Sequence, residues 1–341
     1  MGVRYYIKRV TQAFVTFLTG MFLTYVLYRL IPGGPIDSMR TQIIQRATQQ
    51  GRPPDPERLG RLTEAATGIN TNQGPIVGYI NYISEVLTGN FGESIIFGRP
   101  VFDLLFDAMP WSMFISIYGF IGGLSMTILF GTLMAYKEGT KLDKGLTVFI
   151  MVVNSVPYYV VAILLLVTLG VQWEVLPTGG RYPSGVEAGF NLPFMIGIVE
   201  HAAMPILSNF LVGFAGGAIG MRALGVRVIG ADYIRSAEIR GIGRNRILTR
   251  YIARNTILPI YTGIVIGIAG VFSSSVILEQ IFNYQAVGYL LFTAFTQQDY
   301  PLIMGSFILL TGLTVIGMFV ADVTYGFVDP RAGNPAEREA Y

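Results

Sequence analysis

The segment WSMFISIYGFIGGLSMTILFGTLMAY, residues 111–136, contains no charged side chain. A bilayer core about 30 Å thick is crossed by a helix of about 20 apolar residues. Five other segments are similarly apolar, at 10–31, 146–171, 202–221, 257–278 and 302–327, and Arg29 and Asp322 are the only charged residues within them. The sequence therefore predicts an all-α integral membrane protein with six transmembrane helices.

The composition of the whole chain agrees with this class. Of 341 residues, 52% are hydrophobic and 13% charged, whereas soluble domains carry about 25% charged residues. There is no cysteine and a single histidine, His201, which excludes disulfide frameworks, thiolate metal sites and multi-histidine metal motifs. Because Walker A, His-Glu-x-x-His and Gly-x-Ser-x-Gly motifs are also missing, we expect no catalytic residue, metal or cofactor in this chain.

Short or flanked apolar segments need separate interpretation. The first span follows Arg4, Lys8 and Arg9 and is too long for a signal peptide, so we interpret it as a retained anchor. Two stretches at 192–201 and 286–296 are too short to cross a bilayer, and we interpret them as interfacial or re-entrant segments.

The basic residues predict the orientation, because cytoplasmic loops are rich in Lys and Arg. Lysines fill the 137–144 loop and eight arginines lie in 222–254, whereas 172–201 holds only Arg181 and 279–301 holds none. Both termini and the arginine-rich loop are therefore expected in the cytoplasm. Topology alone explains the basic residues, so no nucleic-acid binding is expected.

The predicted domain organisation follows from these spans. Residues 1–31 form the N-terminal transmembrane helix, and 32–110 an extracytoplasmic insertion in which 38–50 and 75–88 have helical patterns. A five-helix core covers 111–327 with a cytoplasmic loop at 222–256, and 328–341 form a cytoplasmic tail.

The loop between the fourth and fifth spans contains GADYIRSAEIRGIG, residues 230–243. Residues 231–240 predict a short amphipathic helix bounded by glycines. The segment could be only an ordinary positively charged cytoplasmic loop, or the helix could bind in a groove of a cytoplasmic partner. A basic stripe follows at Arg246, Arg250 and Arg254, for which lipid head groups are favoured over a protein partner.

This loop resembles a known motif. Asp232-Tyr-Ile-Arg-Ser-Ala237, then Gly241, Arg254-Asn255 and Leu258-Pro259, resemble the EAA-type coupling loop of ABC-importer permeases, in particular the B-type transmembrane subunit of the oligopeptide/dipeptide permease family. The resemblance extends along the chain through matches at 29–33, 89–94, 100–101, 155–157, 176–180, 201–205, 279–288, 299–301 and 329–331. The loop departs from Glu-Ala-Ala by reading Arg235-Ser236-Ala237.

The resemblance implies a mechanism and partners. The chain would lie in a prokaryotic cell membrane, surrounded by lipid, and pair with a second homologous permease. Two cytoplasmic ATPases would hold ATP and Mg, and an extracytoplasmic solute-binding protein would deliver di- or oligopeptides. Oligosaccharides or nickel chelates are alternative cargoes, and a stand-alone ion-coupled secondary transporter is the alternative of another class.

The resemblance also assigns a set of residues to the ATPase contact: Asp232, Tyr233, Arg235, Ser236, Ala237, Glu238, Arg240 and Gly241. At Gly241 a side chain would hold the helix off its groove or block a turn with positive φ. A plain helix C-cap is the alternative role, and both roles can hold together.

Polar residues near the spans are candidates for the translocation path: Asn154, Ser155, Pro157, Glu200, His201 and Glu279. Proline bends a helix and frees a carbonyl, so 154–157 could line the path or flex. For the ionisable residues, head-group solvation or structural pairing is favoured over cargo contact, and Asp322 is expected to be structural. Two Gly-x-x-x-Gly pairs, at 216/220 and 263/267, are expected to pack within the chain.

Overall fold

The computed structural model describes residues 3–30, 74–229, 231–243 and 275–328, with isolated positions at 40–41, 43–45, 47–48, 51, 55, 58–61, 63, 246–247, 250–251, 267 and 270. These residues form helices and no strand, apart from one isolated bridge between Glu93 and Pro100. The helices are α1 (Val3–Leu30), α4 (Pro75–Leu87), α5 (Val101–Tyr136), α6 (Lys141–Ser155), α7 (Tyr158–Leu165), the π-helix η1 (Leu166–Gln172), α8 (Leu192–Ile229), α9 (Asp232–Ile239), α12 (Val276–Ile281), α13 (Val287–Gln297) and α14 (Tyr300–Val328). The predicted all-α class is confirmed.

Three of the described helices are long and apolar enough to cross a membrane: α5, α8 and α14. The pair formed by α6 with α7 and η1 is a fourth if it counts as one bent span. The predicted anchor corresponds to α1, a helix of 28 residues. Most of the predicted span at 257–278 lies outside the described residues.

Two helices begin before the predicted spans. α5 starts at Val101 and not at the predicted residue 111, and Pro110 lies inside it. Its first turns carry Asp103 and Asp107, so the hydropathy pattern did not mark them as part of a span. α8 starts at Leu192, so the prediction of a separate re-entrant segment at 192–201 is wrong. In both helices polar residues lower the hydropathy of the first turns, but the helix continues through them.

The predicted span at 146–171 is broken. α6 ends at Ser155 and α7 begins at Tyr158, and the two parts are bent by 87°. Pro157 precedes α7 with φ −62°, and a proline there removes the amide hydrogen bond that would carry the helix forward. The expected bend is confirmed, but it is larger than a kink within one helix: the chain forms two separate helices that meet nearly at a right angle. We call this break at 154–157 the corner.

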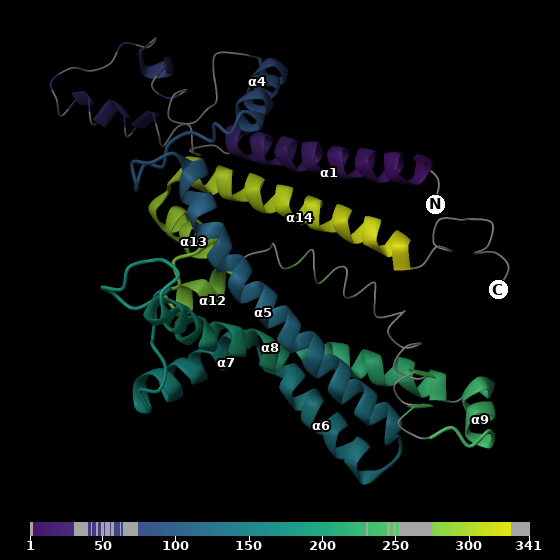
Figure 1. The fold of residues 1–341 in the computed structure, drawn as a ribbon. Helices are drawn as coiled ribbons and strands as arrows, with labels where there is room; N and C mark the ends of the chain where they lie inside the picture. The colour runs from purple at the N-terminus through teal and green to yellow at the C-terminus, as the bar shows by residue number, and fades with distance from the viewer. Residues whose placement is uncertain are drawn as a thin grey trace.

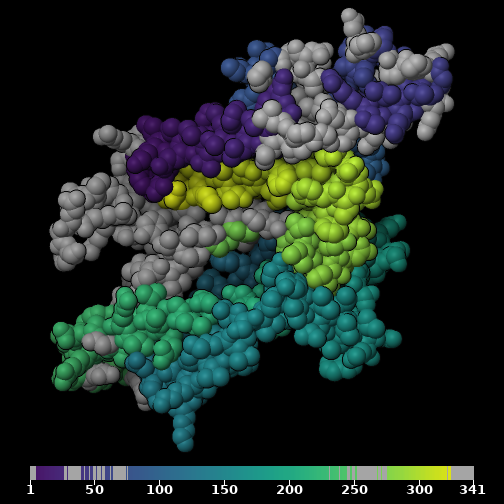
Figure 2. Space-filling view, turned by 180° about the vertical axis from the view of Figure 1, so that it is seen from behind, coloured from purple at the N-terminus to yellow at the C-terminus, as the bar shows by residue number. Residues whose placement is uncertain are grey.

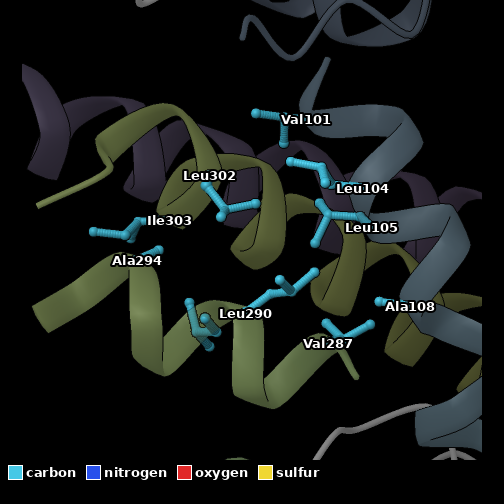
Figure 3. Packing of buried hydrophobic residues seen from close by; sticks show 10 residues of the cluster. Val101, Leu104, Leu105, Ala108, Val287, Leu290, Ala294, Leu302 and Ile303 are labelled. Carbon is cyan, nitrogen blue, oxygen red and sulfur yellow. The ribbon is translucent and has the colours of Figure 1, made fainter. Parts of the chain in front are cut away.

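A hydrophobic core joins the first part of α5 to α13 and α14 (Figure 3). Leu104 and Leu105 of α5 point toward Leu290 of α13 and Leu302 of α14. A buried carboxylate holds the loop between α4 and α5 against this core. Asp299, between α13 and α14, accepts hydrogen bonds from the Ser94 hydroxyl and from the Ile96 amide, the latter at 3.1 Å.

The two ends of the molecule differ. Figure 1 shows the first turn of α1, the last turn of α14 and α9 at one end, with α12 and α13 toward the other. Figure 2, from behind, shows α1 (purple) lying along α14 (yellow). We call the end that holds α9 the α9 end and the other the α13 end.

Candidate functional site

The short helix α9 is defined by its two ends. Asp232 in its first turn places a negative charge at the helix N-terminus, where the helix dipole favours it. After its last residue, Gly241 has φ +70° and the Ile242 amide donates to the Ala237 carbonyl at 3.1 Å. This bond and the left-handed glycine form a Schellman cap. The structure therefore confirms the C-cap role of Gly241.

One side of α9 is buried against its own chain. Ile234 and Ala237 are only 2% and 3% exposed and form a cluster with Ile247. Ile242 packs against this cluster from beyond the cap. The apolar side therefore fixes α9 to the rest of the loop.

The opposite side of α9 is exposed. Of the residues predicted for the ATPase contact, Asp232, Tyr233, Arg235, Ser236, Arg240 and Gly241 are exposed. Ala237 differs, because its side chain faces the permease and anchors the helix. The side chain of Glu238 lies outside the described residues.

Ile239 was not among the residues predicted for this contact from the sequence. It is 81% exposed, the largest exposed fraction of any bulky apolar residue on α9. A β-branched apolar residue next to Arg240 on an otherwise polar face was the available signal, but the same residue could have belonged to the buried side. The exposed face thus combines charges with Tyr233 and Ile239.

A partly buried ion pair stabilises the same end, and it was not predicted from the sequence. Arg222 of α8 binds Asp143 of α6 through two bonds, Nε to Oδ1 at 2.7 Å and Nη2 to Oδ2 at 2.8 Å. The Asp143 carboxylate is almost fully buried and also accepts from the Gly139 amide at 3.0 Å. Beyond α9, Arg246 and Arg250 of the predicted basic stripe are exposed, and Arg254 lies outside the described residues.

The residues predicted for the path fall into two places. Asn154, Ser155 and Pro157 are exposed at the corner between α6 and α7. Asn154 faces α8, because a Cβ on Gly216 would lie 3.5 Å from its Oδ1. Gly216 thus packs within the chain as expected, whereas Gly220 has open space around it.

Glu279 lies at the α13 end and is 2% exposed. Its carboxylate accepts from the Ser112 hydroxyl of α5 at 2.8 Å and from the Tyr289 amide of α13 at 3.0 Å. Ser112 also accepts from the Val287 amide at 3.0 Å. Glu279 therefore joins α5, α12 and α13, which is the structural pairing that the sequence favoured.

Glu200 and His201 lie on α8, at the same end. Glu200 is exposed, and His201 Nδ1 is 2.7 Å from the Gly197 carbonyl. His201 borders the loop before α8, because a Cβ on Gly180 would lie 3.6 Å from its ring. That loop is bound to the turn after α12 by the Gly180 amide, which donates to the Asn283 carbonyl at 3.3 Å.

Asp322 has the structural role expected for it. Its carboxylate is 3.1 Å from Arg9, so the pair links α14 to α1. In the described part of the chain no group of three or more His, Asp or Glu side chains is placed to hold a metal ion.

Comparison with known proteins places the chain in a family. Residues 127–334 match the family model of the binding-protein-dependent transport system inner membrane component. The chain belongs to this family. The predicted recognition as an ABC-importer permease is confirmed, and the protein is a multi-pass membrane component of a transport system.

Individual relatives align with this permease over nearly its whole length. It is 30% identical to the oligopeptide transport system permease protein AppB of Bacillus subtilis (strain 168), over 96% of this chain and 98% of the relative. It is 29% identical to the probable peptide ABC transporter permease protein y4tP of Sinorhizobium fredii, over 97% and 99%. It is 25% identical to the dipeptide transport system permease protein DppB of Escherichia coli (strain K12), over 96% and 98%.

Proposed function

We propose that this permease translocates di- or oligopeptides, driven by ATP hydrolysis on two partner ATPases that hold the ATP and Mg, and that α9 is the element that contacts an ATPase. The observation that carries the proposal is the division of α9 into two sides. Ile234 and Ala237 fasten it to the permease, while Tyr233, Ile239 and Arg240 are exposed. A helix held on one side and open on the other can seat in a groove of a partner.

The bracing of the α9 end supports transmission of movement. An ATPase that shifts α9 also pulls on α8, since only residues 230–231 separate the two helices. The ion pair between Arg222 and Asp143 would transmit this displacement from α8 to α6. Movement of this kind suits a two-state change of a packed bundle, in which helices shift as rigid bodies.

The proposed topology has six spans: α1, α5, the bent pair α6 with α7 and η1, α8, the apolar segment 257–278, and α14. The α9 end and both termini face the cytoplasm, and the insertion at 32–110 lies outside. Support comes from charge, because the N-terminal part of α1, the lysine-containing loop at 137–144 and α9 with its Arg235 all lie at the α9 end.

The proposed partners are a second homologous permease, the two ATPases and an extracytoplasmic solute-binding protein, in a prokaryotic cell membrane. Peptide cargo is supported by the relatives, whose names describe oligopeptide, peptide and dipeptide transport. Within the permease, the corner at 154–157 is the proposed flexing point of the path, and Glu279 serves to hold the α13 end together.

Reconstitution tests the function. The permease, its partners and loaded binding protein are placed in liposomes, and uptake of a labelled peptide is measured with ATP and with a non-hydrolysable analogue. We expect uptake that requires ATP and every partner. Uptake by this chain alone, driven by an ion gradient, would refute the proposal in favour of a secondary transporter, and ATP-driven uptake of oligosaccharides or nickel chelates without peptide uptake would refute the cargo.

Cross-linking tests the contact and the topology together. The chain has no cysteine, so Tyr233→Cys on α9 and Ile80→Cys on α4 each introduce a unique and exposed thiol. We expect Tyr233→Cys to cross-link to an ATPase and Ile80→Cys to react with a membrane-impermeant reagent from outside. Labelling of Tyr233→Cys from outside would contradict the proposal.

A further inference from the structure

An arginine side chain lies over a tryptophan ring at the α13 end. The Cζ atom of Arg181 is 5.0 Å from the centre of the Trp111 ring. Among the described residues no acidic side chain pairs with Arg181. Arg181 is also the only lysine or arginine in the predicted outer loop 172–201.

Aromatic rings surround this pair, and we call the group the Trp111 cluster: Trp111, Arg181, Tyr182, Phe194 and Tyr284. Ring centres lie 5.8 Å from Trp111 to Tyr182, 6.4 Å to Phe194 and 6.4 Å to Tyr284. The hydroxyl of Tyr284 is buried and has no hydrogen-bond partner in the described part of the chain. Within the part of the chain that the structure describes, the cluster therefore contains a cation with no ion-pair partner and a hydroxyl with no hydrogen-bond partner.

The cluster is built by segments that are far apart in the sequence. Trp111 precedes Ser112, whose hydroxyl binds Glu279, and Tyr284 follows the Asn283 carbonyl that accepts from Gly180. Arg181 comes directly after Gly180. The hydrogen bond between Glu279 and Ser112 of α5 and the hydrogen bond between the two loops thus hold Arg181 at a defined place, between Trp111 of α5 and the start of α8.

The chemistry of a stacked guanidinium selects its ligand. A guanidinium held over an aromatic face by a cation–π contact uses no N–H donor in that contact, so its donors remain available for a ligand. These donors match a carboxylate, which they bind through two parallel, charge-assisted hydrogen bonds. Because the guanidinium is half-buried among aromatic rings, a small carboxylate ligand can reach it more easily than the surface of a partner protein can. A protein partner would be bound by fully exposed charges instead.

We propose that Arg181 binds the terminal carboxylate of the peptide cargo as it enters the permease from the binding protein. This inference rests on the proposed peptide transport. It makes the Trp111 cluster a site that selects for a free C-terminus, and it assigns the rings the task of keeping the guanidinium oriented.

The test compares a peptide with its C-terminal amide in the reconstituted complex. Both are supplied on saturating amounts of loaded binding protein, and initial uptake rates are measured for wild type, Arg181→Gln and Arg181→Lys. We expect Arg181→Gln to lower the ratio of free-acid to amide uptake about tenfold, as for a lost hydrogen bond to a charged group. Arg181→Lys keeps the charge without the planar fork, so its ratio should fall between the two.

Arg99→Gln is the matched control. Arg99 lies in the segment before α5, is exposed, and pairs with Asp107 of α5 at 3.0 Å. Its replacement should leave the ratio of free-acid to amide uptake unchanged. An equal loss of free-acid and amide uptake in Arg181→Gln, or no change in either, would overturn the inference. So would weaker docking of the binding protein, which would assign Arg181 to a protein contact. If wild type transports neither peptide, peptide transport itself is refuted, and this inference with it.

Discussion

Replacing Ile239 by alanine isolates the apolar part of the proposed ATPase contact. The substitution removes three outer carbons, each worth about 0.8 kcal/mol when buried. Since 81% of Ile239 is exposed in the permease, nearly all of that surface is available to a partner. If the ATPase groove covers it completely, the binding free energy falls by about 2 kcal/mol, or roughly 30-fold in affinity.

The variant separates docking from folding. Alanine has a higher helix propensity than isoleucine, so α9 itself should be retained. The affinity of the ATPase for the permease in nanodiscs is measured by titration, together with the ATPase rate stimulated by loaded binding protein. Leu87→Ala is the control, because Leu87 is 67% exposed on α4, away from the proposed contact.

Two results would refute this reasoning. An affinity for Ile239→Ala within about twofold of wild type would show that the groove does not cover this residue. An equal loss of affinity in Leu87→Ala would show that the assay reports a general loss of exposed apolar surface, and the specific role of α9 would be lost.

Three further predictions concern the supports of this helix and of the bundle. Gly241→Ala should lower stability by about 1 to 2 kcal/mol because of the positive φ, whereas Gly241→Asn tolerates that φ and should melt near wild type; the claim of a contact at this residue fails if Gly241→Asn also couples transport normally. Arg222→Met leaves the buried Asp143 carboxylate unpaired and should cost about 3 to 5 kcal/mol, measured as a lower melting temperature in detergent, with Arg222→Lys intermediate; equal melting of Met and Lys variants would argue against the ion pair. Gly131→Ala would place its Cβ 2.5 Å from Met221 Cβ and should cost about 1 to 3 kcal/mol by forcing α5 from α8, while Gly145→Ala, which meets nothing within 4 Å, should be neutral or stabilising; a reversed order of melting temperatures would contradict this packing.

The sequence was sufficient for the all-helical class and for the apolar parts of α5, α8 and α14, because hydropathy depends on composition and needs no knowledge of neighbours. It was also sufficient for α9, since Gly241 marks the end of a short amphipathic pattern. It could not assign the sides of α9: Ala237 and Ile239 are both apolar, and only the packing of Ile234 and Ile247 decides which one is buried.

The polar ties were beyond the sequence for another reason. Asp143 and Arg222 are separated by 79 positions, and Ser112 and Glu279 by 167. No local pattern relates such residues, and each of them alone fits a solvated helix end equally well. Pro157 predicted a bend, but the 87° angle depends on what α6 and α7 pack against.

That corner has a consequence for the surrounding lipid. α6 contains 15 residues and spans roughly 22 Å along its axis, while the hydrocarbon layer is about 30 Å thick. Because α7 turns nearly at right angles, it adds little height. In the proposed topology, with α6 along the membrane normal, we expect acyl chains next to α6 to shorten or tilt, which would thin the bilayer beside this helix and bring head groups and water closer to the proposed flexing point.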